Sequence, residues 1–214
     1  MILPRWCFLW LMAVWLMAMG LAGCSSIFPR SAPPVYYQLE YQPPVVHCRQ
    51  AFAKGLRVWQ FTSSSPYRRT EMVVLKPEGK VLFSSAFQWV DNPGTMVAES
   101  LQHDLTESRL FPQVVSANDP AAAPLELSGR VFVFAWERAG TVSRAALQVE
   151  VSLVDTEEPR QVVFRREYDL CSPTFADNSS SAFARAMSGL MRQFSARFQQ
   201  DLCTAASSNS SQGR

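Results

Sequence analysis

The sequence predicts an α+β fold, with an antiparallel or mixed sheet and two main helices packed on one face. In the second half of the chain, three consecutive segments alternate apolar and polar residues, which is typical of strands that bury one face. Two further segments repeat apolar residues every three or four positions, which is the spacing of one helical face. The chain has 214 residues, enough for one domain after an N-terminal leader.

The leader has the three parts of an export signal. Arg5 precedes an unbroken apolar run at residues 6–19, and small residues follow the run. The sequence Leu-Ala-Gly-Cys at residues 21–24 then resembles a bacterial lipobox, in which the Cys is acylated and the chain is cut before it. We therefore expect residues 1–23 to be a lipoprotein signal peptide and Cys24 to carry the lipid.

Residues 24–34 are predicted to form a lipidated tether. They contain Ser and three prolines and few apolar residues, a composition that keeps a linker extended. Ser25 follows the lipidated Cys. In the enterobacterial sorting rule an Asp at this position retains a lipoprotein in the inner membrane, so Ser25 indicates the periplasmic side of the outer membrane. The first expected partner is thus a membrane, bound through the N-terminal lipid.

The first half of the domain is predicted to contain short strands and one hairpin. Strand-forming residues dominate residues 35–41, 56–61 and 72–75. The turn signal Pro-Glu-Gly at residues 77–79 is followed by an alternating segment at residues 80–89. We expect the strands on either side of this turn to pair.

The first helix is predicted to start beside residue 92. Asn92 suits the N-cap position, and the proline after it suits the first helical position. Val97, Leu101 and Leu105 recur every four residues and mark the buried face. Another strand is expected at residues 111–115.

Three strands follow at residues 125–136, 147–153 and 162–170, joined by short turns, and they predict an antiparallel meander. The alternation places three aromatic residues on one face of the first of these strands: Phe132, Phe134 and Trp136. If no helix covered this face, it would be an exposed apolar patch and a candidate interface. The alternative is that the two helices cover it.

The last helix is predicted to cover the sheet. Its apolar residues recur at helical spacing: Phe183, Met187, Leu190, Phe194 and Phe198. The domain is therefore expected to span residues 35–203. Residues 204–214 are mostly Ser, Asn and Ala, which predicts a disordered tail.

Three cysteines remain once the signal peptide and Cys24 are set aside, in a compartment where disulfides persist. They are Cys48, Cys171 and Cys203, so at most one internal disulfide forms. Cys171 and Cys203 would lie at opposite ends of a helix about 30 Å long, beyond disulfide reach. We therefore expect Cys48 to be one partner, with Cys203 or Cys171 as the other.

The sequence offers no catalytic or metal-binding motif. His47 and His103 are its two histidines and it has no Cys-x-x-Cys pair, so no metal site is expected. Phosphate-binding glycine loops and Gly-x-Ser-x-Gly motifs are absent. The net charge of +2 includes Arg5, and no basic stripe points to nucleic acid. We expect a protein without enzymatic activity or cofactor; a catalytic thiol with a histidine as its base is the less favoured alternative.

The order of elements adds a resemblance. The lipobox precedes Tyr-Tyr-Gln-Leu at residues 36–39, Tyr-Arg-Arg at residues 67–69 precedes the hairpin, and Phe-Gln-Trp at residues 87–89 precedes the first helix. A strand at residues 125–134 and a long closing helix complete the order. This arrangement is similar to the ABC-type transport auxiliary lipoprotein family, which includes the paraquat-inducible C lipoproteins. The resemblance covers about residues 35–202, and none of its motifs is catalytic.

The resemblance implies a non-catalytic periplasmic subunit of a mammalian-cell-entry-like lipid transport system that links the inner and outer membranes. The implied partners are a mammalian-cell-entry-type substrate-binding subunit and its ABC permease complex, with ATP used by another subunit. Association of several copies of the chain is compatible with this role. The alternative is an envelope-assembly or structural lipoprotein that supports outer-membrane or peptidoglycan biogenesis, because a fold does not fix a function.

Overall fold

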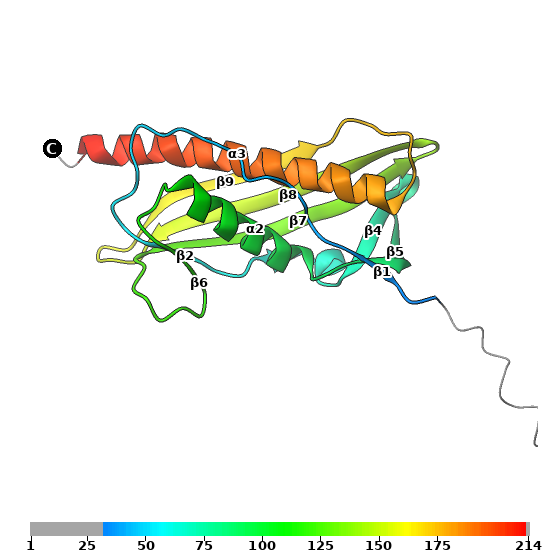
Figure 1. Cartoon of the computed structure of the whole chain (residues 1–214), viewed down its shortest axis with the longest axis horizontal. Helices are drawn as coiled ribbons and strands as arrows, with labels where there is room; N and C mark the ends of the chain where they lie inside the picture. Colours follow the sequence, from blue (N-terminus) through cyan, green and yellow to red (C-terminus); the bar gives the residue numbers. More distant parts are fainter. Residues whose placement is uncertain (1–31, 213–214) are drawn as a thin grey trace, which may run out of the picture. The chain divides into compact units, whose positions relative to one another are not determined.

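The computed structural model describes residues 32–212, and side chains through residue 207. The predicted signal peptide and all but the end of the tether lie outside the described residues. Pro34–Arg214 form one compact unit. Its described part has a nine-stranded mixed sheet and two long helices, α2 (Pro93–Ser108) and α3 (Ser180–Gln212), as Figure 1 shows. The predicted α+β class is confirmed.

The meander in the second half of the chain is the largest part of the sheet. β7 (Leu125–Ala139), β8 (Val142–Asp155) and β9 (Gln161–Cys171) pair antiparallel in sequence order. Their apolar residues alternate with polar ones because one face is buried and the other is exposed. Among the described residues, no helix is both long and apolar enough to cross a membrane.

The other edge of β7 pairs with three short strands in succession. β2 (Leu56–Val58), β3 (Thr62–Ser63) and β4 (Glu71–Lys76) all run parallel to it. β6 (Val114–Ser116) extends this side of the sheet by pairing parallel to β2. The single long strand β7 therefore holds the two halves of the chain together.

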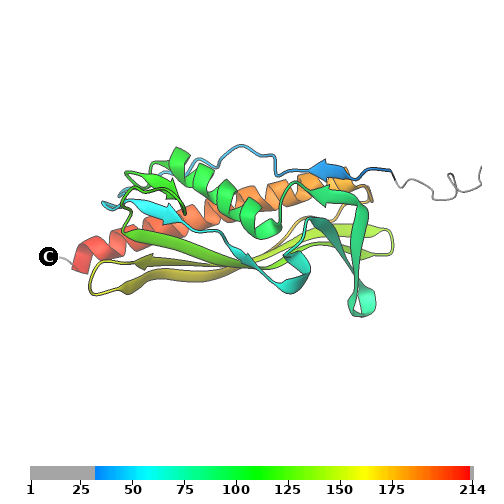
Figure 2. The ribbon, with the colours of Figure 1, turned by 90° about the horizontal axis from the view of Figure 1, so that it is seen from below.

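The predicted hairpin consists of β4 and β5 (Lys80–Trp89), joined by the short helical turn Pro77–Gly79. Glu78 and Gly79 have positive φ angles of 65° and 72°, which the glycine adopts without strain. β1 (Val35–Tyr37) pairs parallel to the end of β5, where Val35 lies opposite Phe87. Figure 2 shows this hairpin standing away from the rest of the sheet.

A β-bulge in β7 corrects one prediction. The pairing with β8 shifts between Val131 and Val133, so β7 contains one residue more than its partner. An extra residue reverses the facing of every later side chain. Phe134 and Trp136 therefore lie on the buried face with Val131, whereas Phe132 is half-buried. The prediction that Phe132, Phe134 and Trp136 share one face is wrong.

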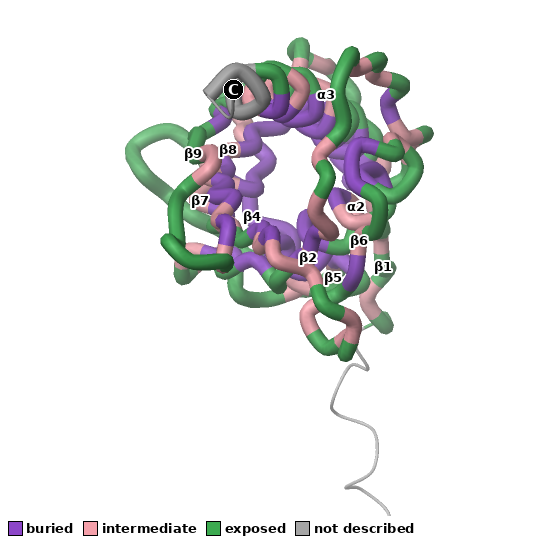
Figure 3. Tube along the Cα trace, turned by 90° about the vertical axis from the view of Figure 1, so that its left-hand side faces the viewer, coloured by how far each residue is buried: buried purple, intermediate pink, exposed green. Residues whose placement is uncertain are grey.

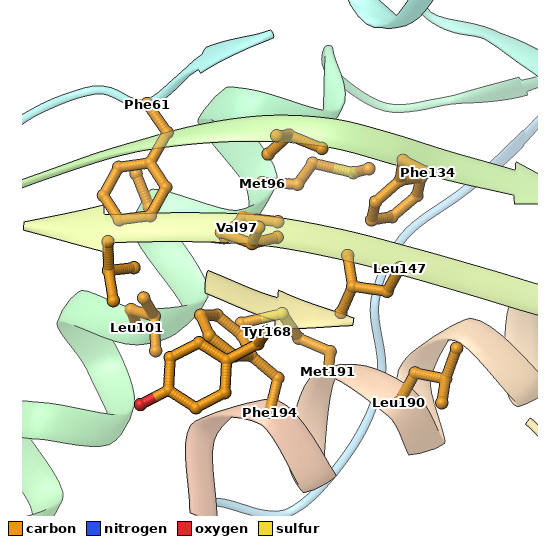
Figure 4. Packing of buried hydrophobic residues seen from close by; sticks show 14 of the residues in the cluster. Phe61, Met96, Val97, Leu101, Phe134, Leu147, Tyr168, Leu190, Met191 and Phe194 are labelled. Atoms are coloured by element: carbon orange, nitrogen blue, oxygen red, sulfur yellow. The ribbon is translucent and has the colours of Figure 1, made fainter. Parts of the chain in front are cut away.

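The core lies between the inner face of the curled sheet and the two helices, as the buried segments in Figure 3 show. The predicted face of α3 supplies five buried side chains: Phe183, Met187, Leu190, Phe194 and Phe198. Figure 4 shows Leu101 of α2 meeting Phe194 of α3 and Tyr168 of β9. Full burial of each such side chain contributes about 1.5–3 kcal/mol, so this contact region is the main source of stability.

Helix α3 is longer than the sequence suggested. It continues beyond Cys203 to Gln212, over residues for which a disordered tail was predicted. The hydroxyls of Thr204 and Ser207 donate to backbone carbonyls one turn earlier, at 3.2 and 2.9 Å. Ser and Thr residues can thus be part of a helix when their hydroxyls bind backbone carbonyls of the preceding turn. Ala206 is buried, so packing also supports the extension.

Candidate functional site: the N-terminal strap

The first described segment is a strap, which we define as residues 34–52, that lies along both helices (Figure 1). It begins with β1 and contains only short regular structure. The hydroxyls of Tyr37 and Ser180 are 2.9 Å apart, at the start of α3. The backbone N–H of Glu40 donates to the Ser188 hydroxyl at 3.0 Å, two turns further along α3. These contacts hold the strap parallel to the first half of that helix.

The strap is also bound to α2 by a buried polar pair. The hydroxyl of Tyr41 donates to Oδ2 of Asp104 at 2.8 Å, and Asp104 is only 1% exposed. Burial raises the pKa of the Asp104 carboxyl, and the neighbouring hydroxyls of Ser195 and Tyr41 partly oppose the shift. Burial, followed by the charge of Asp104, raises the pKa of Tyr41. Tyr41 therefore remains protonated and acts as the donor.

A disulfide joins the strap to the last part of α3. Cys48 and Cys203 are 155 residues apart in sequence, and their Cα atoms are 5.3 Å apart. The pairing is the first of the two that the sequence left open. Cys171, at the end of β9, is free and exposed. In the chain-entropy model a loop of this length gives stabilisation at the upper end of about 2–5 kcal/mol.

Beyond the disulfide, the strap ends in a ring contact. Phe52 stacks on Phe111, with ring centroids 4.7 Å apart and an interplanar angle of 10°. The N–H of Phe52 also donates to the carbonyl of Leu110 at 2.8 Å. The strap is thus fixed at successive points along its length to β5, α3 and α2. A pull on the N-terminus would have to open these contacts one after another and would then reach the covalent Cys48–Cys203 bond.

The residue types that sequence reasoning considered for chemistry take part in structural contacts in the described part of the chain. No group of three or more His, Cys, Asp or Glu residues in this part of the chain could hold a metal ion. Cys48, which follows His47, is bonded to Cys203 and has no free thiol. Asp104 is buried on the protein side of the strap, where it binds Tyr41. The arrangement is suited to holding a segment in place.

The predicted site residues have different outcomes. Cys24 lies outside the described residues. Phe134 and Trp136 are core residues: the Trp136 ring stacks on Phe183 of α3 at 5.4 Å, and Phe134 contacts Trp89 at 5.2 Å. Two of the three aromatic residues are therefore covered, which fits the alternative given by the sequence, whereas Phe132 is half-buried beside Arg130.

Sequence reasoning missed the pair of Tyr41 and Asp104. One signal was available: Asp104 directly precedes Leu105 and follows Leu101 by three positions, so it lies within the buried face of a predicted helix. A carboxylate at such a position needs a polar partner. The partner could not be identified from the sequence, because Tyr41 is 63 residues away. The strand predicted at residues 35–41 also extends beyond β1, which ends at Tyr37, and a strand pattern does not show which helix its side chains face.

Comparison with known proteins adds information about the fold. No family model and no curated protein matches the chain. Among solved structures, protein XCC0632 from Xanthomonas campestris, described with the DUF330 family model, matches with a TM-score of 0.72 and 14% identity. The match covers 83% of this chain and 99% of that chain.

A second solved structure, of an uncharacterised protein, matches with a TM-score of 0.61 and 16% identity, over 80% of this chain and 99% of that one. At these identities the likeness shows a shared fold. Both matched chains are covered almost entirely, so the same overall fold accounts for nearly the whole of each.

Proposed function

We propose that this chain is a non-catalytic lipoprotein, anchored by lipid at Cys24 on the periplasmic side of the outer membrane. It serves as the auxiliary subunit of an ABC-type, mammalian-cell-entry-like lipid transport system that links the inner and outer membranes. The observation that carries the proposal is the strap, because it connects the predicted anchor to the whole domain. A docking subunit needs such a connection if it is to hold a partner at a fixed place on a membrane.

The strength of this connection comes from its covalent part. A hydrogen bond such as that between Glu40 and Ser188 contributes about 0.5–1.5 kcal/mol and can open under load. The Cys48–Cys203 bond joins the strap covalently to α3, so the chain stays attached at Cys48 even if the preceding hydrogen bonds open. The disulfide thus joins a residue near the start of the domain to a residue near its end.

The residues behind the family resemblance support the fold more than a binding surface. Tyr67 and Trp89, from two of its motifs, are 4% and 1% exposed and belong to the core. Tyr37, from a third motif, contacts Ser180. These residues shape the strap and the sheet, so contacts with a transport subunit would be made by other, exposed residues.

The test is in-cell crosslinking of a chain tagged at its C-terminus, followed by mass spectrometry of the recovered proteins. A photoreactive residue at exposed Trp59, beside edge strand β6, and another at Val162, on edge strand β9, sample two different sides. The expected result is recovery of a mammalian-cell-entry-type subunit from one of these sides. Recovery of peptidoglycan enzymes or outer-membrane assembly factors alone would favour the envelope-assembly role instead.

A separate measurement tests the anchor. Metabolic labelling with a radioactive fatty acid is expected to mark the wild-type chain and not the Cys24→Ser variant. Cys171→Ser is the matched control, because Cys171 is the free and exposed thiol of the described residues. Equal labelling of wild type and Cys24→Ser would remove the lipoprotein part of the proposal.

A further inference from the structure

Exposed apolar residues gather at one end of the domain. Ten large apolar side chains are exposed in the described part of the chain, and six of them lie where β1 begins, on the β4–β5 hairpin and at the β7–β8 turn. These six are Val35, Tyr36, Val81, Leu82, Phe83 and Val142. We call this region the entry end, because the described chain enters the fold here through β1 (Figure 1).

The hairpin is the most unusual part of the entry end. Val81, Leu82 and Phe83 are consecutive and are 41%, 46% and 44% exposed. Successive side chains of a strand point to opposite faces, so the hairpin is uncovered on both faces. A strand in water normally carries polar residues on an uncovered face. Three consecutive apolar residues therefore indicate an apolar environment outside the protein.

Basic side chains accompany these residues. Lys76 and Lys80 flank the hairpin turn, and Lys80 pairs with Glu78 at 2.8 Å. Arg138, at the neighbouring β7–β8 turn, has its guanidinium 4.6 Å from the Trp136 ring. Neither Lys76 nor Arg138 has an acidic partner within 4.0 Å among the described residues. The entry end therefore carries excess positive charge beside its apolar residues.

A groove brings the two turns together. It has a volume of about 440 Å³ and lies between the hairpin and the β7–β8 turn, where it is lined by Leu75, Pro77, Ala139 and Val142. Lys76 and Arg138 are also in its lining, together with the Glu137–Arg144 ion pair. The groove thus joins apolar residues to two basic side chains, Lys76 and Arg138, that have no acidic partner among the described residues.

The length of chain before β1 indicates which apolar surface is near. Ten residues separate Cys24 from Val35, so even in a fully extended chain the two residues are at most about 40 Å apart. On the proposed function, lipid at Cys24 therefore keeps the entry end within that distance of a membrane. Val81 is six residues from Phe87, the residue that pairs with Val35, so Val81 is at most about 22 Å further.

We propose that the entry end is a second, peripheral membrane-binding site that takes a phospholipid surface. Val81, Leu82 and Phe83 enter the boundary between headgroups and acyl chains, while Lys76 and Arg138 contact anionic phosphates. Long basic side chains suit this depth because their stems are apolar and their charged ends reach the headgroups. With the lipid as the first attachment, this second one fixes the orientation of the domain on the membrane.

The first experiment measures vesicle binding without the lipid anchor. The chain from residue 24, with Cys24→Ser, contains the whole compact unit. It is sedimented with vesicles of phosphatidylethanolamine and phosphatidylglycerol, and we expect binding that weakens in high salt and on pure phosphatidylcholine. Leu82→Asp is expected to weaken binding about tenfold or more. The matched control is Val162→Asp on β9, which replaces a strand residue that is more exposed than Leu82 (59% against 46%) and lies away from the entry end; this variant is expected to bind normally.

The second experiment places a fluorophore at the hairpin, using Leu82→Cys in a Cys171→Ser background. Lipids brominated in their acyl chains are expected to quench it, and to leave a fluorophore at Val162→Cys unquenched. Far-UV circular dichroism and the melting temperature check that each variant is folded.

The outcomes separate this inference from the proposed function. Absence of vesicle binding, equal binding by wild type and Leu82→Asp, or equal quenching at both positions would overturn the membrane site. Crosslinking of position 82 to a protein without quenching by lipid would overturn it in favour of a protein partner. The chain used for sedimentation has no lipid at residue 24 and is studied without any transport subunit. Its binding to vesicles can therefore be found or refuted whether or not the labelling and crosslinking experiments support the proposed function.

Discussion

Apolar residues lie in opposite environments in the C-terminal part of helix α3 and on the β4–β5 hairpin. In this part of α3, Phe198 and Leu202 are fully buried, and Cys203 is bonded to the strap. On the β4–β5 hairpin, by contrast, Leu82 and Phe83 are almost half exposed. In the first region the apolar side chains pack against other residues of the same chain. In the second region they remain accessible to a surface outside the protein. Stability and binding should therefore respond to different mutations.

The largest expected loss of stability is for a mutation in the buried core beside α3. Phe194→Ala would remove a fully buried ring that lies 5.1 Å from Tyr168 and 6.2 Å from Phe198. The free energy of unfolding should fall by about 3–5 kcal/mol, because the cavity adds to the lost transfer energy. Urea denaturation would measure the change. A loss below about 1 kcal/mol would mean that this part of the core is not closely packed.

The disulfide is expected to have the next largest effect. Cys48→Ser should lower the free energy of unfolding by about 2–5 kcal/mol, because the unfolded chain gains freedom when a long loop opens. Cys171→Ser is the control and should change it by less than about 0.5 kcal/mol, since that side chain is exposed. Thermal unfolding of both variants gives the comparison. Equal stability of the two would show that the strap is held without its covalent bond.

The strap also predicts a pH dependence. Burial raises the pKa of Asp104 above the value it has in the unfolded chain, which is about 3.9. Between these two values the folded chain binds more protons than the unfolded chain, so its free energy of unfolding falls as the pH rises. Asp104→Asn keeps the shape and can still accept from Tyr41, and it should flatten this slope. Urea denaturation from weakly acidic to neutral pH measures it.

The control for this prediction is Glu99→Gln, which changes an exposed carboxylate on the same helix. It should leave the slope as in wild type. An Asp104→Asn variant with an unchanged slope would show that another buried group carries the dependence.

The smallest effect on stability is expected for mutations in the hairpin at the entry end. Leu82→Ser and Phe83→Ser should each change the free energy of unfolding by less than about 0.5 kcal/mol, because both side chains are nearly half exposed. The same changes should weaken vesicle binding. A destabilisation of more than about 1 kcal/mol would mean that the hairpin packs against the domain.

Much of the fold could be predicted from local pattern. The period-two segments predict the meander, and the Pro-Glu-Gly turn predicts the hairpin. The helical spacing of apolar residues predicts which side chains of α3 are buried. The bulge at Phe132 could not be predicted, because nothing in the alternation of residues 125–136 marks an extra residue. That single residue reversed the facing of Phe134 and Trp136.

The candidate site was less accessible to sequence reasoning. The expectation that Cys48 takes part in a disulfide followed from helix length, which separates Cys171 from Cys203. The choice of Cys203 required knowing that the strap runs the length of α3, which is a tertiary property. The strap contacts of Tyr37, Glu40 and Tyr41 join residues 63 to 148 positions apart, and no local pattern encodes them.

The pairing of β7 has a consequence for the order in which the chain folds. The same edge of β7 pairs with β2, β3 and β4. These three strands precede β7 by many residues, so none of them can form this pairing before β7 is present. Apart from the β4–β5 hairpin, the first third of the domain therefore has few native partners until residue 139 has been made. Such non-local pairing is slow to form. The meander should be the first stable piece, and the N-terminal strands should add to it late, although they are synthesised first.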